Sequence, residues 1–593
     1  MKTTTTILLW LCPLLASMSP LRAQQPAAAI RLNQVGFYPA APKVAVVVGA
    51  GAGKFYLTTP GRATPVFTGV LGAARYDSLA RQSTRAADFS GCQQVGTFVL
   101  SVPGVGVSAP FQIRPRAHEA VAQAALKAFY YQRASTALPA AYAGAWSRPA
   151  GHPDRQVLVH GSAASPQRPA GTVLASPGGW YDAGDYNKYV VNSGITLGTL
   201  LALYEDFQTY CTQLNAHIPE SANALPDVLD ESLWNLRWLL TMQDPADGGV
   251  YHKLTNASFD GMVMPTACTT PRYVVQKSTA ATLDFAAVLA QASRVFRGFD
   301  RQLPGLADSC LRAATQAWGW ARQHPTVYYD QAAINKQFQP AIVTGEYGDN
   351  DVTDEWQWAA AELYTTTHQD SYYQAAPLPA TPVPQPAWNQ VRALAYYTLA
   401  RHRPSLTPLG QRGAPQVQQQ LLALADGLLA SPTPTAYQTV MGQTAADYTW
   451  GSNATAANQG IALVQAYRLT GNRRYLRAAL TNLDYLLGRN ATGYCFVTGS
   501  GRQAPQHPHH RLSEGDGVAA PVPGLLVGGP NPGRQDKCAY PSALPPLAYA
   551  DNVCSYASNE VAINWQAPLV YLAAALEALQ TKAGWVSSLP KGH

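Results

Sequence analysis

The sequence has 593 residues, of which 47% are hydrophobic and 13% are charged. This length exceeds that of an ordinary single domain and predicts either several domains or one unusually large one. The hydrophobic share supplies a core and excludes the charge-rich composition of a disordered chain. The formal net charge of +7 is spread along the chain without a run of Lys and Arg, so we expect no nucleic-acid partner.

The first residues follow the order of a secretory signal. Met1 and Lys2 precede an apolar stretch from Ile7 to Ala16, and the small residue Ala23 follows. The stretch is too short to span a bilayer, and no later apolar run reaches the required length of about 18 residues. We therefore predict a signal peptide at 1–23, no membrane span and a secreted protein, either extracellular or periplasmic.

Eight cysteines occur in the sequence, and one of them, Cys12, lies in the predicted signal. An odd number therefore remains in the mature chain, so at least one cysteine is unpaired within it. Cys538 and Cys554 bracket a short stretch and are candidates for a disulfide in an oxidising compartment, although the sequence does not fix the geometry that a disulfide needs. No CxxC pair or Cys/His spacing indicates zinc.

Residues 25–113 differ in pattern from the rest of the chain. Short β-prone runs are separated there by Gly, Pro and Asp, which predicts a β-sandwich. The runs are Val44–Val48, Lys54–Leu57, Pro65–Phe67, Gly96–Val102 and Ala109–Ile113. Pro115 lies between two arginines directly after the last run and indicates a domain boundary.

From Ala117 onward, apolar residues recur at steps of three and four, which predicts helices. The expected helices cover 118–133, 192–209, 225–243, 279–297, 306–324, 351–367, 386–402, 413–430, 456–470, 472–488 and 558–580. Between them lie long loops rich in Gly, Pro and aromatic residues, at 134–191, 244–278, 431–455 and 489–557. Because no short repeat recurs, an α/α toroid at 117–582 fits better than a bundle or a solenoid.

Two closely spaced carboxylates stand out in the segment Pro177–Tyr189. Asp182 and Asp185 are three residues apart beside glycines that let the backbone turn sharply. Such a pair can hold and deprotonate a water molecule. The alternative is an Asx-turn or a helix cap, but the aromatic residues around the pair favour a site. Those we take as substrate-binding candidates are Trp180, Tyr181 and Tyr186.

A second group of polar residues leads into the last predicted helix. Glu560 lies close to the start of that helix, where an acid is often structural because it complements the helix dipole. Because Asp551 and Tyr556 lie nearby, we weigh a catalytic role of Glu560 equally with a structural one. In the loop before them, His509 and Arg511 favour the recognition of sugar hydroxyls over zinc, because no matching ligand follows at helical spacing.

Two acids far apart in sequence, a close acid pair and many aromatic residues in loops suit glycoside hydrolysis. In that chemistry one carboxylic acid protonates the leaving oxygen and another carboxylate activates water. No G-x-S-x-G, Walker, H-E-x-x-H or G-x-G-x-x-G motif offers a competing reaction. Tyr and Trp rings stack on sugar rings, so pyranose polymers are the expected ligand class.

The sequence resembles glycoside hydrolase family nine, the inverting cellulases, in the subgroup with an N-terminal immunoglobulin-like domain. The resemblance covers nearly the whole mature chain through motifs that occur in order. They are Ile30–Phe37, Phe129–Arg133, Asp182–Asp185, Trp238–Gln243, Val250–Lys253, Ser278–Thr282, Trp450–Asn453, Phe496–Gly499, Pro508–Arg511 and Asn559–Val561. It implies an (α/α)6 barrel with an open cleft, preceded by the immunoglobulin-like domain. One departure is Gln566, where the family signature has Asn.

The resemblance also implies roles for individual residues. Asp185 corresponds to the general base, Asp182 to its partner on the water, and Glu560 to the general acid, with about 6.5–9.5 Å between acid and base. Asp551 matches the acidic residue of the second signature. His509 and Arg511 match sugar-binding residues, and His252 lies in the Val250–Lys253 motif. We take His509 and Asp551 as catalytic candidates and Arg511, His252 and Tyr556 as substrate-binding candidates.

The family often binds calcium near a turn that resembles Thr344–Glu355. Its carboxylates suit a hard cation, and the expected ligands are Asp349, Asp354 and Glu355. A solvated acidic loop is the alternative. The occasional structural zinc of the family is not expected, because no cysteine lies between Phe129 and Asp185. The chemistry itself requires no cofactor.

These features together predict a secreted, monomeric, inverting endo-β-1,4-glucanase acting on cellulose-like or mixed-linkage β-glucans. Three alternatives stay open within the same fold. They are an exo-acting cellodextrinase, glucosidase or glucosaminidase, a xyloglucan-active endoglucanase, and a non-catalytic sugar-binding protein. The N-terminal domain is expected to brace the barrel, because no Trp occurs in it.

Overall fold

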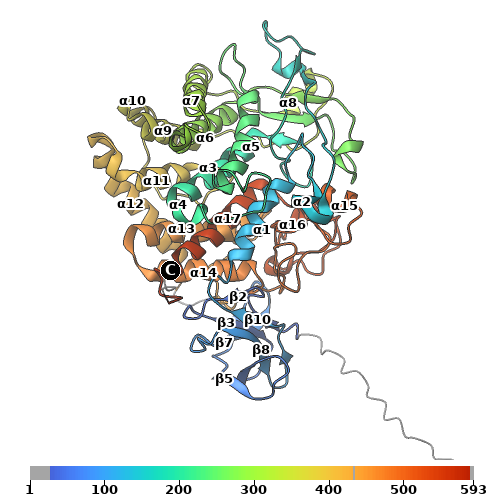
Figure 1. Ribbon diagram of the computed structural model, residues 1–593, viewed down its shortest axis with the longest axis vertical. Helices are drawn as coiled ribbons and strands as arrows, with labels where there is room; N and C mark the ends of the chain where they lie inside the picture. Colours follow the sequence, from blue (N-terminus) through green and yellow to red (C-terminus); the bar gives the residue numbers. More distant parts are fainter. Residues whose placement is uncertain (1–26, 432–434, 588–593) are drawn as a thin grey trace, which may run out of the picture.

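The structure is a computed structural model that describes residues 27–431 and 435–587. The predicted signal peptide at 1–23 lies outside the described residues. Within the described part of the chain, no helix has the length and apolar character needed to cross a membrane. The strands of the N-terminal domain gather at one end of a larger helical domain (Figure 1).

The N-terminal domain is the expected β-sandwich. One sheet has the order β1-β3-β7-β6, and the other has the order β2-β10-β8-β4-β5 with β9 paired to β8. The strands are β1 (Ile30–Arg31), β2 (Gly36–Phe37), β3 (Val44–Val48), β4 (Lys54–Thr58), β5 (Pro65–Val70), β6 (Arg75–Asp77), β7 (Gln82–Asp88), β8 (Gly96–Val102), β9 (Gly106–Val107) and β10 (Phe111–Ile113). Alternate residues of β8, including Phe98 and Leu100, point into a core that also contains Phe37, Phe89 and Phe111.

The predicted helices are confirmed in the larger domain. The long helices are α1 (Glu119–Tyr131), α3 (Val190–Asp206), α5 (Asp227–Met242), α6 (Thr279–Phe296), α7 (Leu306–Gln323), α9 (Thr353–Thr367), α11 (Arg392–Arg401), α12 (Pro408–Leu428), α13 (Ser452–Thr470), α14 (Arg473–Leu486) and α17 (Ile563–Leu579). Short ones are α2 (Ala140–Ala143), α4 (Gln208–Cys211), α8 (Gln331–Gln337), α10 (Asp370–Ala375), α15 (Arg511–Gly515) and α16 (Tyr556–Asn559). Helix α17 packs against α1, α3 and α13 and is buried along nearly its whole length, as an inner barrel helix must be.

Two of the predicted loops, 134–191 and 244–278, are not structureless. They contribute a five-stranded sheet with the order β12-β11-β15-β14-β13. Its strands are β11 (Val157–Val159), β12 (Val173–Leu174), β13 (Lys188–Tyr189), β14 (Lys253–Asn256) and β15 (Arg272–Val274). Strands of two to four residues are too short to show a sequence period. The sheet matters because β13 follows the acid pair and leads directly into α3.

The two domains share a buried polar seam. The hydroxyl of Tyr38 donates to Glu577 Oε1 at 2.7 Å, and the same oxygen accepts the backbone N–H of His118 at 2.7 Å. Asn33 Nδ2 donates to Asp484 Oδ1 at 2.8 Å. Because these groups are buried and satisfy one another, separating the domains would leave polar groups unpaired. The seam fixes the N-terminal domain rigidly on the helical domain.

Replacing Asn33 by alanine removes one of the partners of the buried Asp484 carboxylate. We expect the variant to lose about 1–3 kcal/mol of unfolding free energy, seen as a lower melting temperature in thermal denaturation. The matched control is Asn389→Ala at an exposed position, where the change should be within about 0.5 kcal/mol. Equal melting temperatures for the two variants would refute the bracing role of the seam.

Candidate active site

The acid pair lies on a loop whose glycines are required by its path. Gly178 and Gly179 have φ of 82° and 77°, which glycine adopts without steric cost. A Cβ atom on Gly184 would lie 2.1 Å from the backbone oxygen of His509. Only glycine therefore allows the segment between the two aspartates to lie against the His509 loop.

Asp182 is 1% exposed and is held by hydrogen bonds on both of its oxygens. Asn192 Nδ2, in the first turn of α3, donates to Oδ1 at 2.9 Å and to Oδ2 at 3.0 Å. The hydroxyl of Tyr347 donates to Oδ2 at 3.0 Å. Burial and the charge of Asp185 raise the pKa of Asp182 well above its usual range, while the two donors oppose that shift.

Asp185 is 5% exposed and uses only one of its oxygens for hydrogen bonds to the protein. Its Oδ2 accepts from Asn187 Nδ2 at 2.5 Å and from the Tyr189 hydroxyl at 3.1 Å. Its Oδ1 has no partner among the described residues. That oxygen is therefore available to accept a proton from a water molecule, which is what a general base must do.

Glu560 lies next to the acid pair through direct backbone contacts. The N–H of Ile563 donates to the backbone oxygen of Asp182 at 2.8 Å, and Ala183 and Ala562 form an antiparallel bridge. Burial, followed by the charges of Asp185 and Asp182, raises the pKa of Glu560 well above its usual range, and Arg511 opposes this shift. A carboxyl group that keeps its proton near neutral pH is suited to general-acid catalysis.

Two further catalytic candidates hold the Glu560 segment in place. Asp551 accepts the backbone N–H groups of Gln506 at 2.8 Å and His507 at 2.9 Å, and it also accepts from Asn559 Nδ2 at 3.2 Å. The backbone N–H of His509 donates to the Asn559 oxygen at 2.9 Å. Asp551 thus acts as a positioning residue for the loop before Glu560.

Arg511 is a structural clamp on the acid pair. Its Nη1 donates to the Gly184 oxygen at 2.8 Å, and its Nε donates to the Asp260 oxygen at 2.9 Å. The side chain is 6% exposed. These contacts fix the loop between Asp182 and Asp185, so Arg511 acts on the site mainly by positioning that loop.

Four of the residues predicted to bind substrate are buried in the protein instead. Trp180 and Tyr181 are 0% exposed, Tyr186 is 2% exposed and His252 is 0% exposed. Each side chain has protein partners: Trp180 donates to Glu231, Tyr181 pairs with His152, Tyr186 donates to Val263, and His252 pairs with Ser278. A ring without accessible surface cannot stack on a sugar, so the aromatic residues beside the aspartates are supports for the loop.

Aromatic surface near Glu560 comes from other residues. Trp450 is 42% exposed, and its ring centroid lies 5.5 Å from that of the partly exposed Tyr556. The Tyr556 ring in turn contacts the His509 ring at 5.6 Å. Tyr556 and His509 were predicted, whereas Trp450 was noted only within a family motif. These three rings form a surface suited to sugar stacking.

Comparisons with known proteins give the same assignment. The model of glycosyl hydrolase family 9 matches residues 118–573. The chain belongs to this family. A cellulase N-terminal ig-like domain matches residues 25–107, so both parts of the predicted architecture are confirmed. As a member of family 9, the chain is a glycoside hydrolase.

Relatives resemble this family 9 enzyme over most of its length. It is 46% identical to the xyloglucan-specific endo-β-1,4-glucanase of Bacteroides ovatus, across 95% of this chain and 96% of that one. Endoglucanase D of Acetivibrio thermocellus is 34% identical across 91% and 82%. Among solved structures, that of Bacteroides ovatus GH9 gives a TM-score of 0.89 with 46% identity, covering 93% of this chain and all of that one. A metagenome-derived family 9 endoglucanase gives 0.83 with 34% identity, across 93% and 99%.

The departure at Gln566 from the family 9 signature is accommodated by the fold. Gln566 Oε1 accepts the Leu526 N–H at 2.8 Å, and Nε2 donates to the oxygens of Ala125 at 2.9 Å and Gly524 at 2.7 Å. All its polar atoms are satisfied although it is 3% exposed. The longer amide joins α17 to α1 and to the loop between α15 and α16 that contains Gly524 and Leu526.

The family 9 enzyme also contains an acidic cluster made of the buried Asp284, Asp354 and Glu355 and the half-buried Asp349. Three of these were predicted from the sequence, and Asp284 of α6 was missed because it lies in an apolar helix far from the others. Burial and the neighbouring carboxylates raise the pKa values of Asp284 and Glu355 well above their usual ranges. Both Asp284 oxygens, Asp349 Oδ2 and Glu355 Oε2 have no hydrogen-bond partner among the described residues.

Replacing Tyr347 by phenylalanine removes a hydrogen bond that favours the ionised form of Asp182. The pKa of Asp182 should rise, and Asp182 must be ionised to act as the second acceptor on the attacking water. The acid limb of the kcat/KM profile should therefore move to higher pH by about 0.5–1 unit, while the alkaline limb stays in place.

The matched control for this measurement is Tyr76→Phe on the N-terminal domain, where Tyr76 is 69% exposed. It should leave both limbs of the profile unchanged. An unshifted acid limb in Tyr347→Phe would show that the ionisation of Asp182 does not determine that limb.

Proposed function

We propose that this enzyme hydrolyses β-1,4-glucosidic bonds within β-glucan chains with inversion at the anomeric carbon. Glu560 gives its proton to the glycosidic oxygen as the bond from that oxygen to the anomeric carbon breaks. Asp185 Oδ1 takes a proton from a water molecule that attacks the same carbon from the opposite face, with Asp182 as a second acceptor. Return of the Asp185 proton to solvent and reprotonation of Glu560 complete the cycle.

The observation that carries this proposal is the asymmetry among the three carboxyl groups. Burial and the charges of both aspartates raise the pKa of Glu560 well above its usual range. Asp185 instead presents an oxygen without a protein partner. One group is thus suited to give a proton and the other to take one, and the hydrogen bond from the Ile563 N–H to the Asp182 backbone oxygen joins their two segments.

A β-1,4-glucan substrate with internal cleavage is supported by the relatives named endoglucanases. Xyloglucan is the second candidate, and the specific support for it is the 46% identity to a xyloglucan-specific enzyme over 95% of the chain. We infer that xyloglucan and unsubstituted β-glucans are the substrates to compare first. The exo alternative is supported more weakly, by a cellobiosidase at 31% identity.

Secretion is also part of the proposal. Besides the N-terminal pattern, the pairing of Cys538 with Cys554 supports it, because disulfides persist in oxidising compartments. The disulfide encloses Asp551, so it constrains the segment that leads to Glu560.

We propose in addition that the acidic cluster holds a structural calcium ion. Its orphaned, buried carboxylate oxygens fit a hard cation, and without one they leave like charges uncompensated. Asp349, Asp354 and Glu355, together with Asp284, would hold the ion, which would add only structural support. Asp349, Asp354 and Glu355 follow Tyr347 closely in the chain, so the ion would steady the loop that brings the Tyr347 hydroxyl to Asp182.

The function is tested with Glu560→Gln and Asp185→Asn on xyloglucan, mixed-linkage glucan, carboxymethylcellulose and cello-oligosaccharides. Each variant should lose at least about 100-fold in kcat, whereas Glu514→Gln, at an exposed position on α15, should retain activity. Wild-type enzyme should lower the viscosity of its polymer before reducing sugar accumulates, and proton NMR should show the α-anomer first.

Three results would overturn parts of this proposal. Initial release of the β-anomer would refute inversion. Activity confined to the ends of short oligosaccharides would replace endo by exo action. Retained activity in Glu560→Gln would refute the assignment of the acid.

Calcium is tested by thermal denaturation after treatment with a chelator. Adding calcium at about 100 times its Kd should contribute about 2.7 kcal/mol and raise the melting temperature. Asp284→Asn should abolish most of that rise, and Asp300→Asn at an exposed position should preserve it. Equal rises in the two variants would place the calcium effect elsewhere in the chain.

A further inference from the structure

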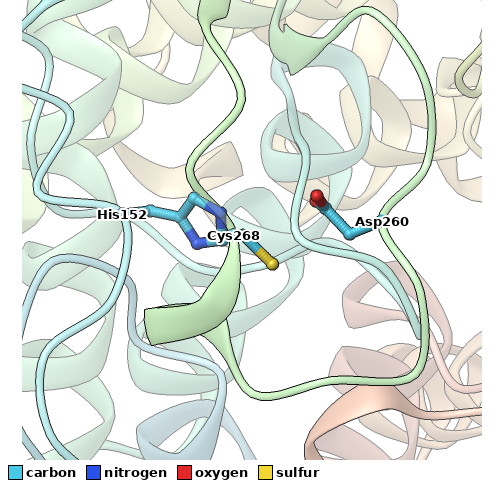
Figure 2. A group of neighbouring side chains, drawn as sticks. All are labelled: His152, Asp260 and Cys268. Atoms are coloured by element: carbon cyan, nitrogen blue, oxygen red, sulfur yellow. The ribbon is translucent and has the colours of Figure 1, made fainter.

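A group of three potential metal ligands lies beside the active site but outside it. One ligand atom from each of His152, Asp260 and Cys268 lies within 4.8 Å of the other two. His152 is on the segment before β11, whereas Asp260 and Cys268 are on the loop that joins β14 to β15 (Figure 2). The group therefore lies where two loops distant in sequence meet.

His152 has the arrangement of a metal-binding imidazole. The ring is 4% exposed, and its Nδ1 lies 2.9 Å from the Tyr181 hydroxyl. Its Nε2 is buried without a hydrogen-bond partner among the described residues. In metal sites, the second ring nitrogen is commonly fixed by a neighbouring group in this way. An unpaired buried nitrogen costs free energy, so its persistence requires an explanation.

The charges around the group are compatible with a bound dication. Burial and the cations Arg272, Lys188 and Arg148 lower the pKa of His152 to about 2, so the imidazole is neutral and able to coordinate. Arg272 and Lys188 are themselves paired with Asp154, at 2.9 Å and 2.7 Å. Asp260 supplies a negative charge within the group.

Cys268 is the third donor; its thiol donates to the Met264 backbone oxygen, 3.8 Å from Sγ, and also interacts with the Asp260 carboxylate. Burial and the Asp260 carboxylate raise the pKa of the Cys268 thiol to about 12. A metal ion would take the place of that proton: three metal–ligand bonds form, the thiol proton goes to solvent, and no group is oxidised or reduced. A dication bound to one thiolate and one carboxylate leaves the group without net charge.

The donor set selects the class of metal. Nitrogen, oxygen and sulfur donors together suit zinc and disfavour calcium or magnesium, which take oxygen ligands. Donors bound to tetrahedral zinc lie roughly 3.3–3.8 Å apart, so the three atoms need to close by about 1 Å. Asp260 and Cys268 are only partly buried, which leaves an entry path and room for a water molecule as fourth ligand.

We propose that His152 Nε2, the Asp260 carboxylate and Cys268 Sγ form a structural site for zinc, completed by water. The structural zinc of the family was not expected because no cysteine lies between Phe129 and Asp185. Cys268 lies outside that stretch, so the present ligand set is a different one. Both the cysteine and the aspartate come from the β14–β15 loop. The group was not predicted from the sequence because His152 lies more than one hundred residues before Asp260 and Cys268.

The site would tie the β14–β15 loop to the loop that carries the acid pair. Tyr181, the partner of His152, directly precedes Asp182. The same β14–β15 loop already supplies the Asp260 oxygen to Arg511 and the Val263 oxygen to Tyr186. The metal would add a third connection, so its role is to position the loops and not to take part in bond cleavage.

The test uses the full mature chain without an affinity tag, because a histidine tag itself binds zinc. The protein is stripped with a chelator, saturated with calcium to fill oxygen sites, dialysed against zinc and analysed for metal by mass spectrometry. We expect about one zinc per chain. Cys268→Ala and Asp260→Asn should each bind zinc at least about tenfold more weakly, and Cys310→Ala, at a buried thiol of α7, should bind normally.

Cobalt provides a second readout that identifies the ligand. Cobalt(II) added to the stripped protein should produce a thiolate-to-metal charge-transfer absorption, which Cys268→Ser should abolish. The metal-free melting temperature of Cys268→Ser should equal that of the metal-free wild type, which excludes misfolding as the cause. Absence of stoichiometric zinc, or the same zinc content in Cys268→Ala and wild type, would overturn the proposal.

Discussion

The close approach of two loops is the constraint on which the site depends. The segment 182–185 must lie against the backbone at 509 and 559–563, and Gly184 permits this because it has no side chain. Backbone hydrogen bonds then hold base and acid segments together without using any carboxylate oxygen. Asp185 Oδ1 therefore has no hydrogen-bond partner among the described residues, while main-chain atoms hold the two segments together.

Burial has two different effects on the residues of these loops. At Glu560 it raises the affinity for a proton, which an acid catalyst needs. At Trp180 and Tyr181 it gives rigidity, since these rings fill the space behind the loop and are bound to buried partners. Residues next to each other in one motif thus divide into groups that react and groups that support, as expected where a site must be held to within fractions of an ångström.

Much of the fold could be predicted because amphipathic helices leave a periodic pattern of apolar residues, as in α7 or α14. The small third sheet could not, because strands such as β13 have only two residues. In the site, Asp182, Asp185 and Glu560 were found from their residue types and from a family resemblance. The burial of Tyr181 and Tyr186 was not predicted, because the sequence beside a carboxylate looks the same whether an aromatic side chain faces a sugar or the core. Tyr347 was missed because its contact with Asp182 spans 165 positions.

Helix α17 connects the active site with the interface between the two domains. Its first residue, Ile563, is hydrogen-bonded to Asp182, and Glu577 near its other end receives the hydroxyl of Tyr38 from the N-terminal domain. The domain boundary in the sequence is therefore not a boundary for recombination. In a chimera that takes its immunoglobulin-like module from a relative, the hydrogen bonds of the domain interface would be mismatched. One of them lies at the far end of the helix that begins in the active site. The interface is kept only if residues 33, 38, 484 and 577 are exchanged as a set.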